Sequence, residues 1–272
     1  MRVSVELPQI LANVLNANST PDRIRRSLGA LAGAIARGSA ALLEARGHRA
    51  VIWSPSGASA GDLSEGLRAN GALEVQCTTV LSADLADIAS CDAVLIALPG
   101  YAHKVVFDRL AASLPDGLPV IVSSHVSFGA LYLQQTLAER GVTCPVTCWG
   151  TTAVTGRSMP GGVTVNTIRS KIDLCTVPEV ASSNGLVLCQ ELFGDVFVPR
   201  TGLMAITLSN LNPQNHLGIA IGNMTRMERG EIWSQGQNIT PNVGRLMEKL
   251  DAEELRFGGF QPQVELATLA LE

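Results

Sequence analysis

The chain is poor in features that would mark several common classes of protein. Only 16% of its 272 residues are charged and 4% are aromatic. No apolar run approaches the roughly 20 residues that a membrane-spanning helix needs. No cluster of Lys and Arg offsets the net charge of −4, which argues against a nucleic-acid surface. Residues 1–18 contain a single Arg and carry Glu6, so they make a poor signal peptide.

What is abundant is small and apolar. Hydrophobic residues make up 46% of the chain, with Ala, Gly, Val and Leu the commonest, and this bias suits helices packed closely on a parallel sheet. The length allows one large or two ordinary domains. Of the six cysteines only Cys144 and Cys148 lie close in sequence, and no His or second pair completes a metal site. We therefore expect buried, reduced thiols, no metal, and a cytoplasmic location.

Strand-like and helix-like segments alternate over much of the chain. Continuous or alternating apolar runs predict strands, and Ala- and Leu-rich runs that stop at a Gly predict helices. The expected strands are 49–53, 73–79, 93–98 and 119–123, and the expected helices are 34–46, 83–89, 103–113 and 129–140. This alternation implies right-handed crossovers and an α/β fold with a Rossmann-like, doubly wound parallel sheet.

The organisation changes along the chain. Residues 142–200 are more β-like, with short strands expected at 163–165 and 196–198, and the sequence beyond residue 203 favours helices. We accordingly expect a Rossmann-like dinucleotide-binding domain over 1–203, with 6–28 as an atypical insertion. A small, partial α-helical substrate domain is expected over 204–272.

A glycine turn is the candidate dinucleotide site. Aligned on Gly33 and Ala36, the pattern G-x-G-x-x-G/A has Leu31 in its first position, and Gly29 comes two residues too early. If residues 1–5 form the first strand, 23 residues separate it from Gly29. Either the turn carries an insertion, or one long helix runs from Pro21 to Arg46, which the helix start at residues 19–22 favours. A helix that packs closely through Gly and Ala would show the same residues.

The carboxyl ends of parallel strands form the edge at which such folds bind their ligands. The strand at 49–53 is followed by two serines and no acidic residue, which favours the 2′-phosphate of NADP over the ribose hydroxyls of NAD. His125, near Ser123, is a further contact with the nicotinamide half. The candidate cofactor-binding residues are Gly29, Gly33, Ala34, Ile35, Ser54, Ser56, Leu98, Pro99, His103 and Ser123.

The segment 211–218 places His216 just after an Asn-Pro turn. Imidazole titrates near neutral pH, so it can lend a proton to a carbonyl oxygen and take it back. Asn212 precedes it and is positioned to orient a substrate carboxylate, and Arg157 is either a carboxylate ligand or a surface residue. His48 is expected to cap the helix before it. A last acidic group is expected on a solvated helix face, and it comprises Asp251, Glu253 and Glu254.

In this order and spacing, these segments resemble the octopine/nopaline (opine) dehydrogenase family from about Gly29 to Asp251. The matching segments include the turn ending at Ala36, residues 45–54, Phe128-Gly129-Ala130-Leu131 and Asn212-Pro213-x-x-His216. The resemblance implies a Rossmann domain followed by an α-helical domain. It also implies NAD(P)H-dependent reductive condensation of an amino acid with an α-keto acid, with His216 as the catalytic histidine. The family continues well beyond this sequence, and the acidic partner of the histidine is expected from that region.

Two alternatives remain open from the residues. The first is a 2-keto-acid or ketopantoate-type reductase, which shares the fold but reduces C=O without an amine, so dependence of turnover on an amine separates the two. The second is a shortened, inactive nucleotide-binding or interaction protein. Its exposed apolar surface would be covered by a second subunit, giving a homodimer.

Overall fold

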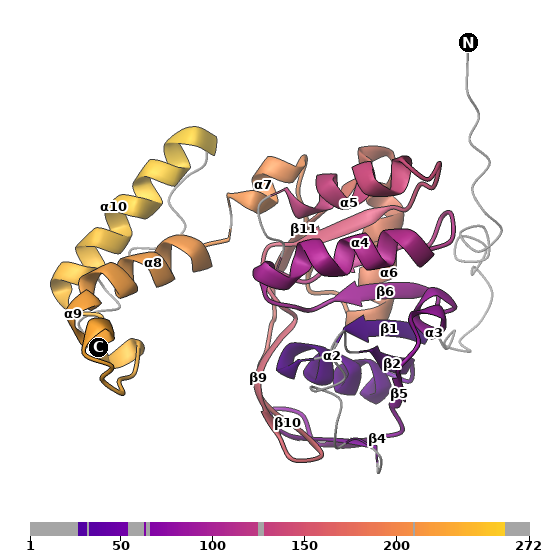
Figure 1. Ribbon diagram of the computed structural model, residues 1–272, viewed down its shortest axis with the longest axis horizontal. Helices are drawn as coiled ribbons and strands as arrows, with labels where there is room; N and C mark the ends of the chain where they lie inside the picture. The colour runs from indigo at the N-terminus through magenta and orange to yellow at the C-terminus, as the bar shows by residue number, and fades with distance from the viewer. Residues whose placement is uncertain are drawn as a thin grey trace. The chain divides into compact units, whose positions relative to one another are not determined.

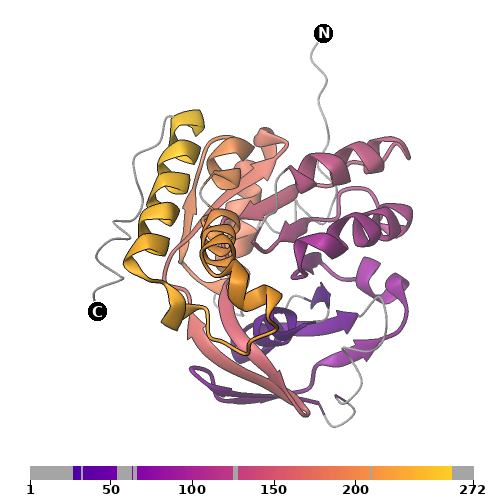
Figure 2. The ribbon, with the colours of Figure 1, turned by 60° about the vertical axis from the view of Figure 1, so that its left-hand side comes forward.

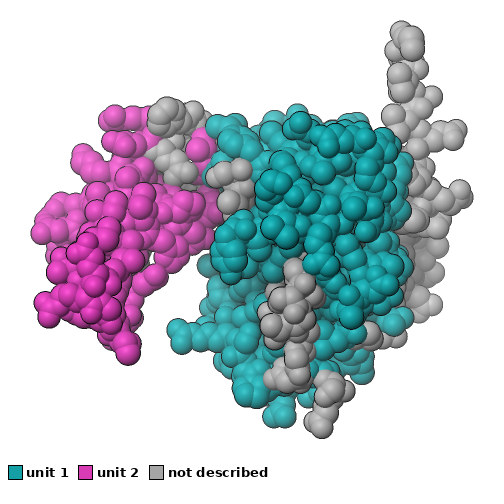
Figure 3. Space-filling view, in the orientation of Figure 1, with its two compact units in different colours: residues 1–207 teal, residues 208–272 magenta. Residues whose placement is uncertain are grey.

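The computed structural model describes residues 27–31, 33–53, 63, 66–124, 128–208 and 210–258. By its internal contacts the chain divides into two compact units, residues 1–207 and 208–272, which Figure 3 shows in teal and magenta. The first unit carries all the strands found among the described residues, and the second is helical there.

The first unit is built on an eight-stranded sheet with the order β12-β11-β8-β7-β6-β1-β2-β5. From β5 to β8 every neighbouring pair is parallel, whereas β11 runs antiparallel to β8 and parallel to β12. The expected doubly wound parallel sheet is thereby confirmed. The strands are β1 (Ser27–Leu31), β2 (Arg49–Trp53), β5 (Val80–Ser82), β6 (Ala93–Ile96), β7 (Val120–Val122), β8 (Val146–Trp149), β11 (Ile172–Val177) and β12 (Phe197–Pro199).

Helices cover both faces of this sheet, as Figures 1 and 2 show. Successive side chains of a strand point to opposite faces of the sheet, so alternate residues pack into two separate hydrophobic cores. One core contains α2 (Ala34–Ala45) and α6 (Ser182–Phe193). The other contains α3 (Leu85–Ala89), α4 (His103–Ser113), α5 (Gly129–Ala138) and α7 (Leu203–Thr207). Two short 3-10 turns, Gly100–Ala102 and Glu179–Ala181, precede α4 and α6.

A second sheet, which the sequence did not lead us to expect, packs against α2. Its order is β4-β3-β10-β9, formed by β3 (Leu67–Gly71), β4 (Val75–Cys77), β9 (Val154–Met159) and β10 (Gly162–Ile168). Helix α2 therefore lies between two sheets, and within it only Ala45 is exposed. A Cβ added at Gly38 would stand 2.8 Å from Val154 Cγ2. Arg37, also buried, donates from Nη1 to the Gly162 carbonyl oxygen over 3.0 Å.

The position of β1 corrects two expectations. Ser27–Leu31 forms a strand that pairs in parallel with β2 and β6, so neither a helix from Pro21 to Arg46 nor a 23-residue insertion in the turn is present. The five residues, Ser-Leu-Gly-Ala-Leu, have no strong local preference, and pairing with neighbours on both sides decides their conformation. Residues 1–5 and the helix start expected at 19–22 lie outside the described residues.

The second unit contains α8 (Asn212–Gly222), α9 (Met224–Glu228), a 3-10 turn at Gly236–Asn238, and α10 (Pro241–Gly258). Helices α8 and α10 run antiparallel, because Gly222 packs on Val243 and Gly218 on Met247. A small core forms around this seam, with Ile219 buried between them. Among the described residues, no helix is both long enough and apolar enough to span a membrane.

Candidate functional site

The turn between β1 and α2 has the geometry of an anion site. Gly33 has φ 150° and ψ 173°, a conformation open essentially to glycine, and α2 starts at the next residue. The first backbone hydrogen bond of the helix runs from Arg37 N to Gly33 O over 2.9 Å, so the N–H groups of Ala34 and Ile35 have no partner within the helix. No acidic side chain lies in this first turn. Exposed N–H groups and the helix dipole together favour a bound phosphate.

The turn lies where the strand order reverses, with β1 between β2 and β6. Gly33 reaches the end of β6, because a Cβ added to it would stand 3.8 Å from the Ala97 carbonyl oxygen. Leu98 and Pro99 continue from that strand. Gly29, by contrast, lies inside β1 opposite Val51 and Val94, so it is not part of the turn. The structure thus brings Gly33, Leu98 and Pro99 to one edge and leaves Gly29 inside the sheet.

His103 begins α4 at the same edge and is buried. Its Nε2 lies 3.0 Å from the Leu98 carbonyl oxygen, which fixes the ring proton on Nε2. Burial lowers the pKa of His103, against a smaller opposing effect of that hydrogen bond. Within the described part of the chain Nδ1 has no hydrogen-bond partner, and the ring packs on Phe107 with centroids 5.1 Å apart. His103 is therefore a neutral side chain that fixes the turn after β6.

Ser123 follows β7 and is almost fully buried. Its N–H donates to the Ile96 carbonyl oxygen over 2.9 Å, while its Oγ has no partner among the residues described. Ser124 and Phe128, with φ 57° and 59°, are the two non-glycine residues of positive φ in the part of the chain that the structure describes. Such strained conformations concentrate at functional sites. His125 lies between them, outside the described residues.

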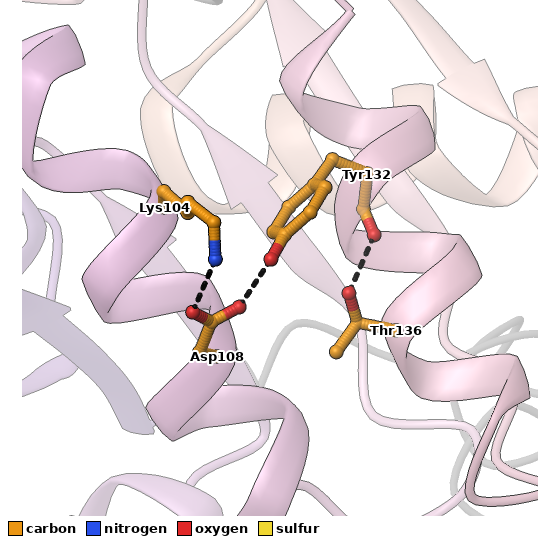
Figure 4. Close-up of polar contacts among 4 residues, drawn as sticks. All are labelled: Lys104, Asp108, Tyr132 and Thr136. Atoms are coloured by element: carbon orange, nitrogen blue, oxygen red, sulfur yellow. Dashed lines mark hydrogen bonds and ion pairs between the residues drawn. The ribbon is translucent and has the colours of Figure 1, made fainter.

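A polar cluster that the sequence did not reveal joins α4 to α5 (Figure 4). Lys104 Nζ lies 2.8 Å from one oxygen of Asp108, and the Tyr132 hydroxyl donates to the other over 2.5 Å. Both hydrogen bonds, first that from Lys104, lower the pKa of Asp108. The Lys104 ammonium also stands 5.2 Å from the centre of the Tyr132 ring. The side chains of Lys104 and Asp108 are exposed, so the cluster ties two helices at the surface and adds little to stability.

In the second unit, His216 and Asn212 lie on α8. His216 is exposed, and within the described ranges it has no hydrogen-bond or ion-pair partner. Asn212 is the first residue of the helix, and its backbone N and its Nδ2 both donate to Asn210 Oδ1, over 3.2 and 2.9 Å. The buried Asn210 thus fixes the start of α8 at Asn212, and Asn212 lies one turn before His216.

Asp251, expected on a solvated face, is buried against α8. Burial raises the pKa of Asp251, and the neighbouring Gln214 amide opposes that effect. Gln214 is itself buried. Asp251 lies one turn beyond Met247, on the face of α10 that packs against α8 near His216, whereas Glu253 is exposed. The side chain of Glu254 lies outside the described residues.

Four further expected residues complete the placement. Arg157 is exposed on β9 of the second sheet, opposite Thr164, and so it is not on the edge that carries Gly33. His48 caps α2 through its backbone, because its N–H donates to the Leu43 carbonyl oxygen over 3.0 Å, while its ring Nε2 lies 3.1 Å from the Glu191 carbonyl oxygen of α6. Ser54 and Ser56 lie outside the described residues. All six cysteines are free and buried, as expected.

Comparison with known proteins relates this chain to opine dehydrogenases. Residues 199–259 match the model of the NAD/NADP octopine/nopaline dehydrogenase alpha-helical domain. The opine dehydrogenase of Arthrobacter sp. (strain 1C) is 31% identical over 175 residues, which are 62% of this chain and 47% of the relative. The chain thus spans about half the length of that curated relative.

Solved structures share the fold. One is an octopine dehydrogenase with NADH and pyruvate. Its alignment covers 90% of this chain and 69% of the octopine dehydrogenase chain, with a TM-score of 0.63 at 14% identity. An NADP+-bound yersinopine dehydrogenase covers 75% of this chain and 54% of its own, with a TM-score of 0.58 at 17% identity. The helical-domain match and the curated relative agree with the resemblance drawn from the residues, and the chain shares the fold of the solved opine dehydrogenases.

Proposed function

We propose that this chain is an NAD(P)H-dependent opine-type dehydrogenase that joins an amino acid to an α-keto acid by reductive condensation. The observation that carries the proposal is the β1–Gly33–α2 turn at the point where the strand order reverses. It stands in a chain whose later residues match the helical domain of this enzyme family. The substrates named for the octopine dehydrogenase structures, pyruvate and L-arginine, indicate the substrate classes to test first.

The residues present fit a dinucleotide. The N–H groups of Ala34 and Ile35 would hold the pyrophosphate, and Gly33 leaves room for its close approach. The edge formed by Leu98, Pro99 and Ser123 would face the nicotinamide half. We propose NADP as the preferred coenzyme and NAD as the alternative, on the strength of Ser54 and Ser56 after β2 and the lack of an acidic residue between them.

The reaction assigns a role to the polar residues of α8. An amine and a keto acid condense to an imine with loss of water, and the bound coenzyme supplies the hydride that reduces it. His216, which is exposed and has no partner among the described residues, would donate a proton to the keto oxygen and take one from the attacking amine. Asn212, held at the helix start by Asn210, would orient the substrate carboxylate.

A fluorescence titration with NADPH and separately with NADH tests the coenzyme site. We expect saturable binding at micromolar concentration, tighter for NADPH. Gly33→Val should weaken it strongly, because a β-branched residue cannot adopt this conformation without strain. Gly236→Ala, at an open position in the second unit, is the matched control. No binding by the parent chain at about 1 mM, a free energy weaker than about −4 kcal/mol, would refute the proposal and leave the inactive-protein alternative.

Turnover tests the chemistry. NADPH oxidation should require both pyruvate and a basic amino acid, and His216→Asn should abolish it while leaving coenzyme binding intact. Oxidation with the keto acid alone would instead identify a ketopantoate-type reductase. The exposed Ser183→Ala on α6 serves as the control variant.

We further propose a cytoplasmic homodimer. Leu217, Ile221 and Met224 are each about half exposed on successive turns of the second unit, forming an apolar stripe of the kind that subunit contacts cover. Six free, buried thiols suit a reducing compartment. Light scattering should give twice the mass of 28.6 kDa, and Ile221→Glu should return the monomer, unlike Glu228→Gln on the exposed α9.

A further inference from the structure

Two cysteines from different strands form a pair inside the first unit. Cys148 on β8 stands directly opposite Cys175 on β11 in the antiparallel register. Both belong to the same buried core, and both are free. Directly opposed residues of antiparallel strands have Cα atoms about 4.5–5.5 Å apart, inside the roughly 4.4–6.8 Å that a disulfide spans. We propose that Cys148 and Cys175 are an oxidation site, a dithiol that a small peroxide converts into a disulfide between β8 and β11.

The two thiols are not equivalent. The neighbouring Cys148 side chain lowers the pKa of Cys175, whereas burial raises the pKa of Cys148. The thiolate is the reactive form of cysteine, so Cys175 is the nucleophile and Cys148 the resolving thiol. Elsewhere among the described cysteines the trend is the reverse, since burial raises the pKa of Cys77 and Cys189 to about 12.

The chemistry balances with hydrogen peroxide as the oxidant. The Cys175 thiolate attacks one peroxide oxygen, the O–O bond breaks, and hydroxide leaves with a sulfenic acid on Cys175. The Cys148 sulfur then attacks the sulfenic sulfur, the S–O bond breaks, and water leaves as the disulfide forms. Each peroxide accepts two electrons from the pair. Both sulfurs are buried, which favours an oxidant as small as peroxide over a bulky disulfide.

The backbone around the pair places the two cysteines at a spacing that a disulfide can span. Gly150 N donates to the Asp173 carbonyl oxygen over 2.9 Å, so Cys148 and Cys175, two residues away along each strand, also fall at a hydrogen-bonded position of the ladder. The Cα atoms of such a pair are about 5.5 Å apart, near the commonest spacing in disulfides. The site packs under α7, the last helix before the second unit begins at Leu208.

Peptide mapping of the full chain tests the proposal. The folded chain is treated with hydrogen peroxide, blocked with an alkylating reagent under denaturing conditions, digested without reductant and analysed by mass spectrometry. We expect one linked peptide pair joining Cys148 to Cys175, lost on treatment with dithiothreitol. Cys148→Ser should leave a sulfenic acid on Cys175 that dimedone traps, whereas Cys175→Ser should leave Cys148 unreacted. Cys91→Ser, at a buried cysteine of another segment, should keep the linked pair.

Several outcomes would overturn the proposal. One is that both thiols stay intact under a peroxide treatment that oxidises a free cysteine standard. The others are oxidation to sulfinic acid without a linked peptide, and a link that involves another cysteine. Circular dichroism before and after treatment shows whether the fold is kept, and a link formed only after its loss also counts against the site. The test does not depend on coenzyme binding or turnover.

Discussion

Replacing Gly185 by Ala should destabilise the first unit strongly. Gly185 lies on α6 against two buried threonines, Thr147 of β8 and Thr176 of β11, whose hydroxyls are hydrogen-bonded over 3.0 Å. A Cβ at Gly185 would collide with Thr176 Oγ1 and stand 2.6 Å from Thr147 Oγ1. The added atom is fixed by the helix backbone, so the two threonine side chains would have to move and break the hydrogen bond between them.

The magnitude follows from three contributions. Overpacking a buried site costs about 1–3 kcal/mol, and separating two buried hydroxyls costs about 1–3 kcal/mol more. The better helix propensity of Ala returns about 1 kcal/mol. We expect a net loss of about 3 kcal/mol in the free energy of unfolding, measured by urea denaturation followed by circular dichroism. Ser183→Ala, an exposed position on the same helix, should stay within about 0.5 kcal/mol of the parent.

A double-mutant cycle isolates the cause. Thr176→Ala removes the atom nearest the new Cβ, so Gly185→Ala should cost less than half as much in that background. An unchanged cost in the Thr176→Ala background would refute the collision as the cause. A single-mutant loss below about 0.5 kcal/mol would refute the close packing of α6 on the sheet.

Three further predictions concern titration and packing. Because burial lowers the pKa of His103 in the folded chain, stability should fall as pH drops below its unfolded value of about 6.5, and His103→Gln should flatten that dependence in urea midpoints between pH 7.5 and 5.5. Burial raises the pKa of Asp251, so the stability that this group contributes should be present below its unfolded pKa of about 3.9 and lost as pH rises through its folded pKa. Asp251→Asn should therefore raise the urea midpoint at pH 7. An unchanged midpoint would contradict this reasoning. Gly222→Ala places a Cβ 2.5 Å from Val243 Cγ2 and should cost about 1–3 kcal/mol, whereas Gly236→Ala, with open space around it, should be neutral by the same assay.

The sequence predicted the elements whose signal is local. The apolar runs of β6 and β7 could hardly be anything but buried parallel strands, and α4 begins and ends at the expected residues, His103 and Ser113. Helix α2 was predicted because Gly47 ends it with a positive φ. In these segments the hydrophobic pattern and the turn residues favour the same structure that tertiary packing imposes.

What could not be predicted depends on partners distant in sequence. Strand β3, Leu-Arg-Ala-Asn-Gly, has little strand character, and it forms because β10, about a hundred residues later, pairs with it. The same holds for β1, whose conformation is decided by β2 and β6. Asp251 was expected to be solvated because its neighbours are acidic, and only the docking of α8 shows that it is buried.

Enclosing α2 between two sheets has a consequence for which substitutions this helix can accept. A helix with a solvent face tolerates charged and bulky residues on that side, but α2 has Ala45 as its single exposed residue. A side chain added at Gly38 could not turn toward solvent and would have to displace Val154. The departure from the glycine pattern at Leu31 falls in the strand, outside this enclosed helix.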